Sequence, residues 1–114
     1  MTEGWDDEDD ETWEAFTARA VDAKLAALAN PARRLALELL VSGDATAGDL
    51  AASIADTFGV SASRASQHLQ VLARADLVRV NPDGLLRNYR LNETGLAEIS
   101  AWIASLKLEN EAGR

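Results

Sequence analysis

The chain of 114 residues carries a formal net charge of −8, and it contains one histidine and no cysteine. This length is typical of a single domain, and the lack of cysteine excludes disulfides and thiolate metal chemistry. With one histidine, no nucleophile–base pair and no phosphate-binding glycine loop, the sequence offers nothing from which to build an active site, so we expect no enzyme and no cofactor.

The acidic residues are concentrated at the N-terminus. Residues 1–14 contain eight of the 19 acids and no base, whereas the rest of the chain has eleven of each sign. Such a segment cannot bury enough apolar surface to fold, so we expect a flexible acidic tail at 1–11 before one domain at 12–114. The tail either keeps the protein soluble or competes for a basic surface elsewhere on the chain. Because there is no run of about 18 apolar residues, we expect no membrane span. Because the N-terminus is acidic, rather than basic and followed by an apolar region, we expect no secretory signal, and hence a cytoplasmic protein.

Two helices are predicted in the first 43 residues. The first begins at Thr12 and ends near Ala29. The second begins at Asn30-Pro31, because Asn caps a helix and Pro fits its first position, and it ends near Gly43. It is expected to bury Leu35, Leu39 and Leu40.

A third helix is predicted after Thr46. Thr46 and Asp49 resemble a capping box in its Asp variant, and the helix continues to about Phe58, where Gly59 ends it. Ser61 or Ser63 then caps a fourth helix, which ends near Asp76.

The fourth helix is polar in its first half and apolar in its second. Its early positions are Ser61, Ser63, Arg64, Ser66, Gln67 and His68, and its later ones include Leu69, Val71, Leu72 and Ala75. A helix that enters the major groove of DNA needs this division, because base edges are read by short polar side chains, Gln and Arg near its N-terminal end.

The spacing within this helix divides its polar side chains between two roles. Ser63, Arg64 and Gln67 share a face, which we expect to read base edges. We expect Ser61, Ser66 and His68 to contact phosphates or the groove wall. The alternative is a solvated polar face, and His68 in particular could instead bond a neighbouring carbonyl.

A β-hairpin is predicted next, as the wing of a winged helix-turn-helix. Its strands are 77–80 and 85–91, and Pro82 and Gly84 supply the turn between them. Residues 60–90 contain five arginines against two aspartates, so this part of the chain is locally basic. We expect the wing to contact the DNA backbone rather than to read bases in the minor groove, because Asp83 at the turn disfavours deep insertion. The wing residues expected to make these contacts are Arg79, Arg87, Asn88 and Arg90. The alternative is an exposed hairpin whose arginines serve solubility.

The last predicted helix follows Asn92, which can cap it. Its apolar residues recur at three- and four-residue spacing, and with the first helix they are expected to seal a twofold interface rather than pack on their own domain. The predicted interface residues are Trp13, Phe16, Leu96, Ile99, Trp102, Ile103 and Leu106.

Four motifs resemble the ArsR-type winged-helix repressors over roughly residues 25–105. They are Leu28-Ala29-Asn30-Pro31-Ala32-Arg33-Arg34 at the second helix, Ser66-Gln67-His68-Leu69-Gln70-Val71-Leu72 in the fourth, Ala75-Asp76-Leu77-Val78 before the wing, and Tyr89-Arg90-Leu91 at its end. The resemblance implies a homodimeric transcriptional regulator that binds double-stranded DNA and dimerises through its first and last helices.

The metal sites of the family's metal sensors are not present in this sequence. Thr46 and Gly48 stand where those members place a cysteine pair, and the last helix contains no histidine. We therefore expect no metal site, and the sequence leaves open whether an effector binds.

These observations predict a mostly α-helical winged helix-turn-helix fold with four helices, a two-stranded wing and a fifth helix. The predicted function is sequence-specific transcriptional regulation, as a homodimeric repressor on a palindromic operator. The competing interpretation is a winged-helix protein-interaction module that does not bind DNA, with its acidic surface serving a partner.

Overall fold

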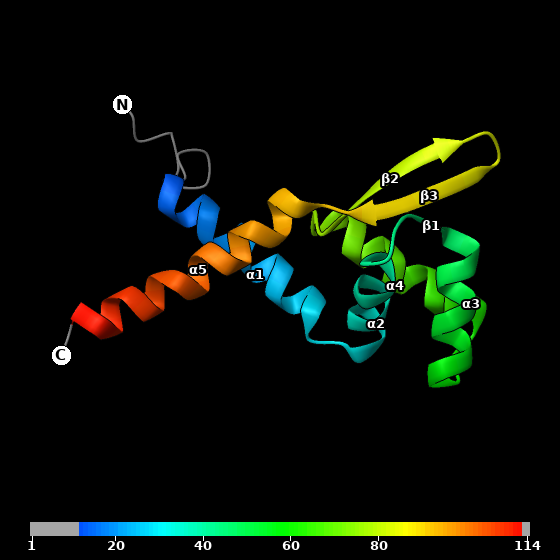
Figure 1. Ribbon diagram of the computed structural model, residues 1–114, viewed down its shortest axis with the longest axis horizontal. Helices are drawn as coiled ribbons and strands as arrows, with labels where there is room; N and C mark the ends of the chain where they lie inside the picture. The colour runs from blue at the N-terminus through cyan, green and yellow to red at the C-terminus, as the bar shows by residue number, and fades with distance from the viewer. Residues whose placement is uncertain (1–11, 113–114) are drawn as a thin grey trace, which may run out of the picture.

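The computed structural model describes residues 12–112 of the chain, so the predicted tail at 1–11 lies outside the described residues. The predicted fold class is confirmed: five helices and an antiparallel hairpin occur in the expected order (Figure 1). The elements are α1 (Trp13–Leu28), α2 (Pro31–Leu40), β1 (Ala45–Thr46), α3 (Ala47–Phe58), α4 (Ala62–Arg74), β2 (Val78–Asp83), β3 (Leu86–Leu91) and α5 (Glu93–Ala112). No described helix has the length and apolar character needed to cross a membrane.

Local capping interactions explain where the helices begin. The side chains of Thr12, Asn30, Thr46 and Ser61 each accept a hydrogen bond from a backbone N–H in the first turn of the helix that follows. A cap of this kind satisfies one of the donors that a helix leaves unpaired at its start. Gly59 ends α3 in the left-handed conformation, with φ of 66°, which glycine adopts without steric cost.

The second helix buries a different stripe from the one predicted. Ala32, Ala36, Leu37 and Leu40 are its buried residues, whereas Leu39 is 39% exposed and Leu35 is half-buried. The prediction of a buried Leu39 was therefore wrong. Because α2 packs against both α3 and α4, the small side chains of Ala32 and Ala36 face its neighbours and allow close approach.

The hairpin is longer than predicted, and its turn lies elsewhere. β2 continues to Asp83, which pairs with Leu86 across Gly84-Leu85, and Gly84 has φ of 64°. Pro82 is therefore inside a strand, opposite Arg87, and not in the turn. Proline is tolerated there because the strand order β1-β3-β2 makes β2 an edge strand. The short strand β1, which pairs with β3, was not predicted.

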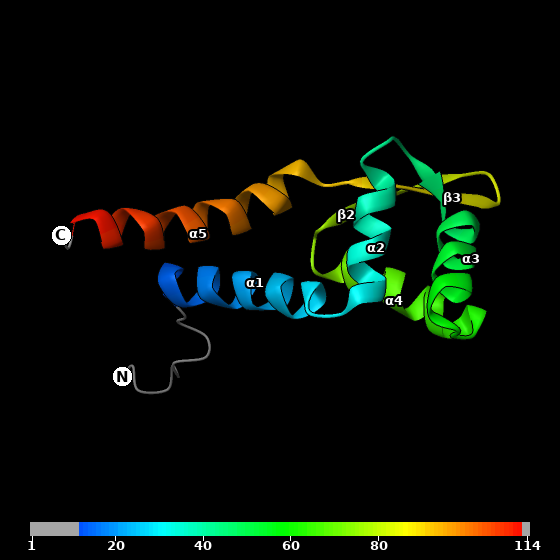
Figure 2. The same ribbon diagram turned by 60° about the horizontal axis from the view of Figure 1, so that its bottom comes forward.

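The core lies between α2, α3, α4 and the base of the wing. Its largest fully buried side chains are Leu50, Ile54, Leu69, Leu72 and Leu77. α1 and α5 lie side by side and extend away from this body (Figures 1 and 2). The DNA-binding and dimerisation elements predicted from the sequence are therefore at opposite ends of the protomer.

A compact junction joins α5 to the end of α4. The Asn92 backbone N–H donates to the Leu77 carbonyl (3.0 Å), and its side-chain N–H donates to the Asp76 carbonyl (3.0 Å). Its side-chain oxygen accepts from the Gly95 N–H (3.3 Å). A Cβ at Gly95 would collide with the Asp76 carbonyl, so this close approach requires glycine. Beside the junction, the buried Lys24 of α1 pairs with Glu98 of α5 at 3.1 Å.

Candidate nucleic-acid interface

The outer face of α4 is exposed and polar, while its inner face is held by the core. Ala65, Leu69 and Leu72 are buried, whereas Ser63, Arg64, Ser66 and Gln67 are exposed. The preceding α3 packs directly on α4, as the first helix of a helix-turn-helix does. The residues predicted to read bases therefore share an accessible surface on a helix that is fixed from behind.

Ser61 is part of the cap of α4. Its Oγ accepts a hydrogen bond from the Arg64 N–H at 3.0 Å, which leaves its hydroxyl hydrogen free to donate outward. The residue is exposed. A capping role and a contact with a phosphate are therefore compatible at this position.

His68 is anchored to the body of the protein by Arg33. Its Nδ1 lies 3.0 Å from an Arg33 Nη1, and the same guanidinium donates to the carbonyls of Ala27 (2.8 Å) and Ala26 (3.3 Å) at the end of α1. Burial, and then the positive charges of Arg33 and Arg64, lower the pKa of His68 from 6.5. The neutral imidazole accepts from Arg33 through Nδ1, so its hydrogen is on Nε2. The partner is thus a guanidinium and not the carbonyl considered from the sequence.

The two faces of the wing separate the predicted wing residues. Arg87 shares a face with Val80 and Tyr89, and all three line the same cleft beside α4. Because side chains alternate along a strand, Asn88 and Arg90 are on the other face. So is Arg79, which is the cross-strand partner of Arg90.

The outer face of the wing has its own local contacts. Asn88 pairs with Thr46 in the register of β1 and β3, and Arg90 Nε lies 3.9 Å from Asp44. The structure therefore brings Arg87 next to α4 but does not bring Arg79, Asn88 and Arg90 there.

The cleft between α4 and the wing also contains residues that the sequence analysis missed. It has a volume of about 560 Å³. Its lining residues are Ala47, Ser66, Leu69, Gln70, Ala73, Arg74, Val80, Arg87 and Tyr89. Gln70 and Arg74 could have been found, because they continue the helical stripe of Ser63 and Gln67 at three- and four-residue spacing. Burial raises the pKa of Tyr89, and the charge of Arg87 opposes this effect.

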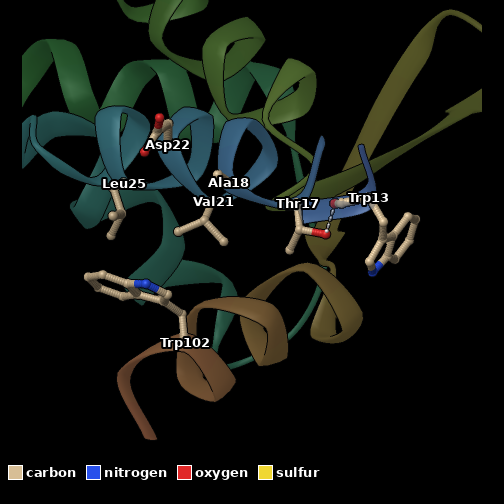
Figure 3. A pocket seen from close by; sticks show the side chains of 7 residues that line it. All are labelled: Trp13, Thr17, Ala18, Val21, Asp22, Leu25 and Trp102. Atoms are coloured by element: carbon tan, nitrogen blue, oxygen red, sulfur yellow. Dashed lines mark hydrogen bonds between the residues drawn. The ribbon is translucent and has the colours of Figure 1, made fainter. Parts of the chain in front are cut away.

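A second, apolar groove lies between α1 and α5. Its volume is about 410 Å³, and Figure 3 shows Trp102 of α5 opposite Val21 and Leu25 of α1. Trp13 lies at the other end of this groove, with its ring centroid 5.5 Å from that of Phe16.

Most of the predicted interface residues are exposed in the protomer. Trp13 is 73% exposed, and Phe16, Trp102, Ile103 and Leu106 are at least 41% exposed. Ile99 differs, because it is buried within the protomer itself, and Leu96 is partly buried against the same core. Among the residues whose side chains the structure describes (12–13 and 15–106), there is no group of three or more His, Cys, Asp or Glu side chains arranged to hold a metal ion.

Comparisons with known proteins agree with this geometry. A helix-turn-helix domain model matches residues 28–81. The transcriptional repressor SdpR of Bacillus subtilis is 38% identical over 77 residues, which cover 68% of this chain and 81% of SdpR. The HTH-type transcriptional regulator Rv2034 of Mycobacterium tuberculosis is 41% identical over 83 residues, 73% of this chain and 74% of that protein.

A solved structure adds information on assembly. The homodimeric winged helix-turn-helix DNA-binding domain of Mb0332 from Mycobacterium bovis, a possible ArsR-family transcriptional regulator, superposes with a TM-score of 0.64 at 26% identity. The match covers 87% of this chain and 88% of that domain.

Proposed function

The chain belongs to the ArsR-type family of winged helix-turn-helix transcriptional regulators, and from that premise we propose that it represses transcription as a homodimer bound to a palindromic operator. The observation that carries the proposal is the exposed face of α4, where Ser63, Arg64 and Gln67 stand on a helix whose opposite face is buried. Arg pairs with guanine and Gln with adenine in the major groove.

Dimerisation is supported by the apolar surface of α1 and α5. Trp13, Phe16, Trp102, Ile103 and Leu106 are exposed together along these two helices, and contiguous apolar surface of this kind marks an interaction site. The Mb0332 domain is itself homodimeric. Two α4 helices about a twofold axis would enter successive major grooves about 34–36 Å apart, which requires an operator with palindromic half-sites.

The remaining predicted residues are proposed as contacts with the DNA backbone. Ser61 and Ser66 flank the base-reading face of α4, and Arg87 extends the basic surface from α4 onto the wing. We assign His68 a positioning role in addition, because Arg33 fixes its ring. Arg79, Asn88 and Arg90 would act from the outer face of the wing, on the flanking backbone.

Single substitutions in α4 test the assignment of its outer face to base reading. The operator is first isolated by selection of bound fragments from random DNA. Arg64→Ala and Gln67→Ala should each cost about 1–3 kcal/mol of operator binding and relax discrimination at one position per half-site. The measurement is a mobility shift against the operator and single-base variants.

Arg34→Ala provides the matched control for this experiment. It removes the same charge from an exposed position in α2, where Arg34 donates to the Leu28 carbonyl (2.7 Å). It should leave base preference unchanged. Full operator affinity in both α4 variants would show that this face does not read DNA, and selection of no DNA at all would favour a protein-interaction module.

A further inference from the structure

The cleft between α4 and the wing has a cationic lining. Arg74 of α4 and Arg87 of β3 both line it, together with the hydroxyl of Ser66 and the amide of Gln70. No carboxylate lines the cleft, and neither arginine forms an ion pair with any side chain of residues 12–13 or 15–106. Two guanidinium groups beside neutral hydrogen-bond donors are suited to an anion with several oxygens, because each can donate more than one N–H.

The other walls of the cleft strengthen this attraction. They are apolar or aromatic: Ala47, Leu69, Ala73, Val80 and Tyr89. Leu69 and Tyr89 are buried, so the cleft is bounded by low-dielectric protein rather than by water on that side. Charges interact more strongly in such surroundings than on a flat, fully hydrated surface.

The place of Arg74 on α4 indicates where the anion comes from. Arg74 is ten residues beyond Arg64, which is about 15 Å along a helix axis. The major groove is about 12 Å wide. When the first half of α4 reads base edges, Arg74 therefore lies beyond the bases, beside the sugar-phosphate backbone that borders the groove.

We propose that this cleft binds one backbone phosphate of the operator in each half-site, held between Arg74 and Arg87. Ser66 and Gln70 donate additional hydrogen bonds to the phosphate oxygens. The proposal rests on the proposed function and adds to it a contact site that joins the recognition helix to the wing. It gives Arg74 a role in positioning α4 and none in base reading.

The site is tested by comparing how the wild-type chain and Arg74→Ala bind operators with and without one neutralised phosphate. Arg74→Ala should lower the affinity for operator and for non-specific DNA by about the same factor, about tenfold. The slope of the logarithm of the binding constant against the logarithm of the salt concentration should fall in magnitude by about one unit. A methylphosphonate placed at one backbone position per half-site should weaken binding of the wild-type chain. The same modification should weaken binding by Arg74→Ala much less than binding by the wild-type chain, because Arg74 no longer contacts that phosphate and Arg87 alone supplies a charge there. Arg74→Lys keeps the charge and should recover part of the affinity.

Two controls distinguish this proposal from the wider function. Urea unfolding of Arg74→Ala should match the wild type, because Arg74 is exposed. The methylphosphonate should still weaken operator binding by Arg64→Ala, because the contact that this variant has lost is with a base and not with the phosphate. The phosphate site is overturned if Arg74→Ala binds with wild-type affinity, or if every methylphosphonate weakens binding by Arg74→Ala as much as it weakens binding by the wild-type chain. If the wild-type chain binds no DNA, the proposed function fails and the site fails with it.

Discussion

His68 is the only histidine of the chain, and the structure holds it between two cations. Because burial and the charges of Arg33 and Arg64 lower its pKa below 6.5, the folded state binds fewer protons than the unfolded state as the pH falls through that value. Above the pKa that His68 has in the unfolded chain, its contribution to the free energy of unfolding is complete. That contribution is lost as the pH falls toward the lower pKa that His68 has in the folded state.

A comparison of unfolding at two pH values measures this effect. Urea unfolding of the wild type should give a lower free energy at pH 5 than at pH 7.5. His68→Gln keeps an acceptor for Arg33 but has no group that titrates in this range, so the difference between the two pH values should be smaller in the variant. An equal difference in both proteins would mean that His68 keeps its ordinary pKa in the fold.

Asp76 illustrates how a single residue can accept an unfavourable backbone conformation. It has φ of 63° and is the only described non-glycine residue with a positive φ. Aspartate tolerates this region better than most residues. The Asp76 carbonyl accepts from Asn92 and lies against Gly95, so the strained conformation is held by the start of α5.

At the scale of elements, the sequence predicts helix starts and ends, because these are determined by residues close together in the chain. Asn30 and Thr46 mark helix starts through hydrogen bonds within three residues, and Gly59 marks a helix end through its own φ. β1 could not be predicted, because two residues become a strand only through pairing with Tyr89 and Asn88 of β3. Helical spacing places Arg74 on the stripe of Ser63 and Gln67, but its position in a cleft could not be predicted, because the other wall of that cleft is the wing.

The cap of α4 offers a test at this scale that separates stability from binding. Ser61→Ala removes the acceptor for the Arg64 N–H and should lower the free energy of unfolding by about 1 kcal/mol. Ser61→Asp keeps an acceptor and places a negative charge at a helix N-terminus, so stability should be retained. The same charge would repel phosphates, so Ser61→Asp should bind the operator more weakly than Ser61→Ala. Tighter binding by the aspartate variant would place Ser61 away from DNA.

At the scale of the whole molecule, the proposed dimer depends on side chains that the protomer leaves exposed. Ile103 is 52% exposed, so the carboxylate of Ile103→Asp stays hydrated in the monomer and the fold should be preserved. In the dimer, the same carboxylate would be buried without a partner, which is strongly unfavourable. Sedimentation equilibrium should therefore detect a folded monomer that has lost operator binding.

Ala101→Asp is the matched control, because Ala101 is exposed and lies on the opposite side of α5 from Ile103 by helical spacing. It should remain dimeric. A stable dimer of Ile103→Asp, with circular dichroism unchanged, would move the interface to another surface.

The junction at Asn92 has a consequence for the length of the operator. Two hydrogen bonds of this residue join the start of α5 to Asp76 and Leu77, just after α4, and a third caps α5 itself. In the proposed dimer, the twofold axis and the two recognition helices should therefore keep a constant separation and angle. DNA turns once in about 10–10.5 base pairs, and one pair inserted between half-sites rotates the second by about 35°. Because these hydrogen bonds hold the start of α5 close to the end of α4, that rotation should be absorbed by twisting the duplex or by releasing one α4. The protein should therefore discriminate between operators by the number of base pairs between the half-sites as strictly as by the base sequence of the half-sites.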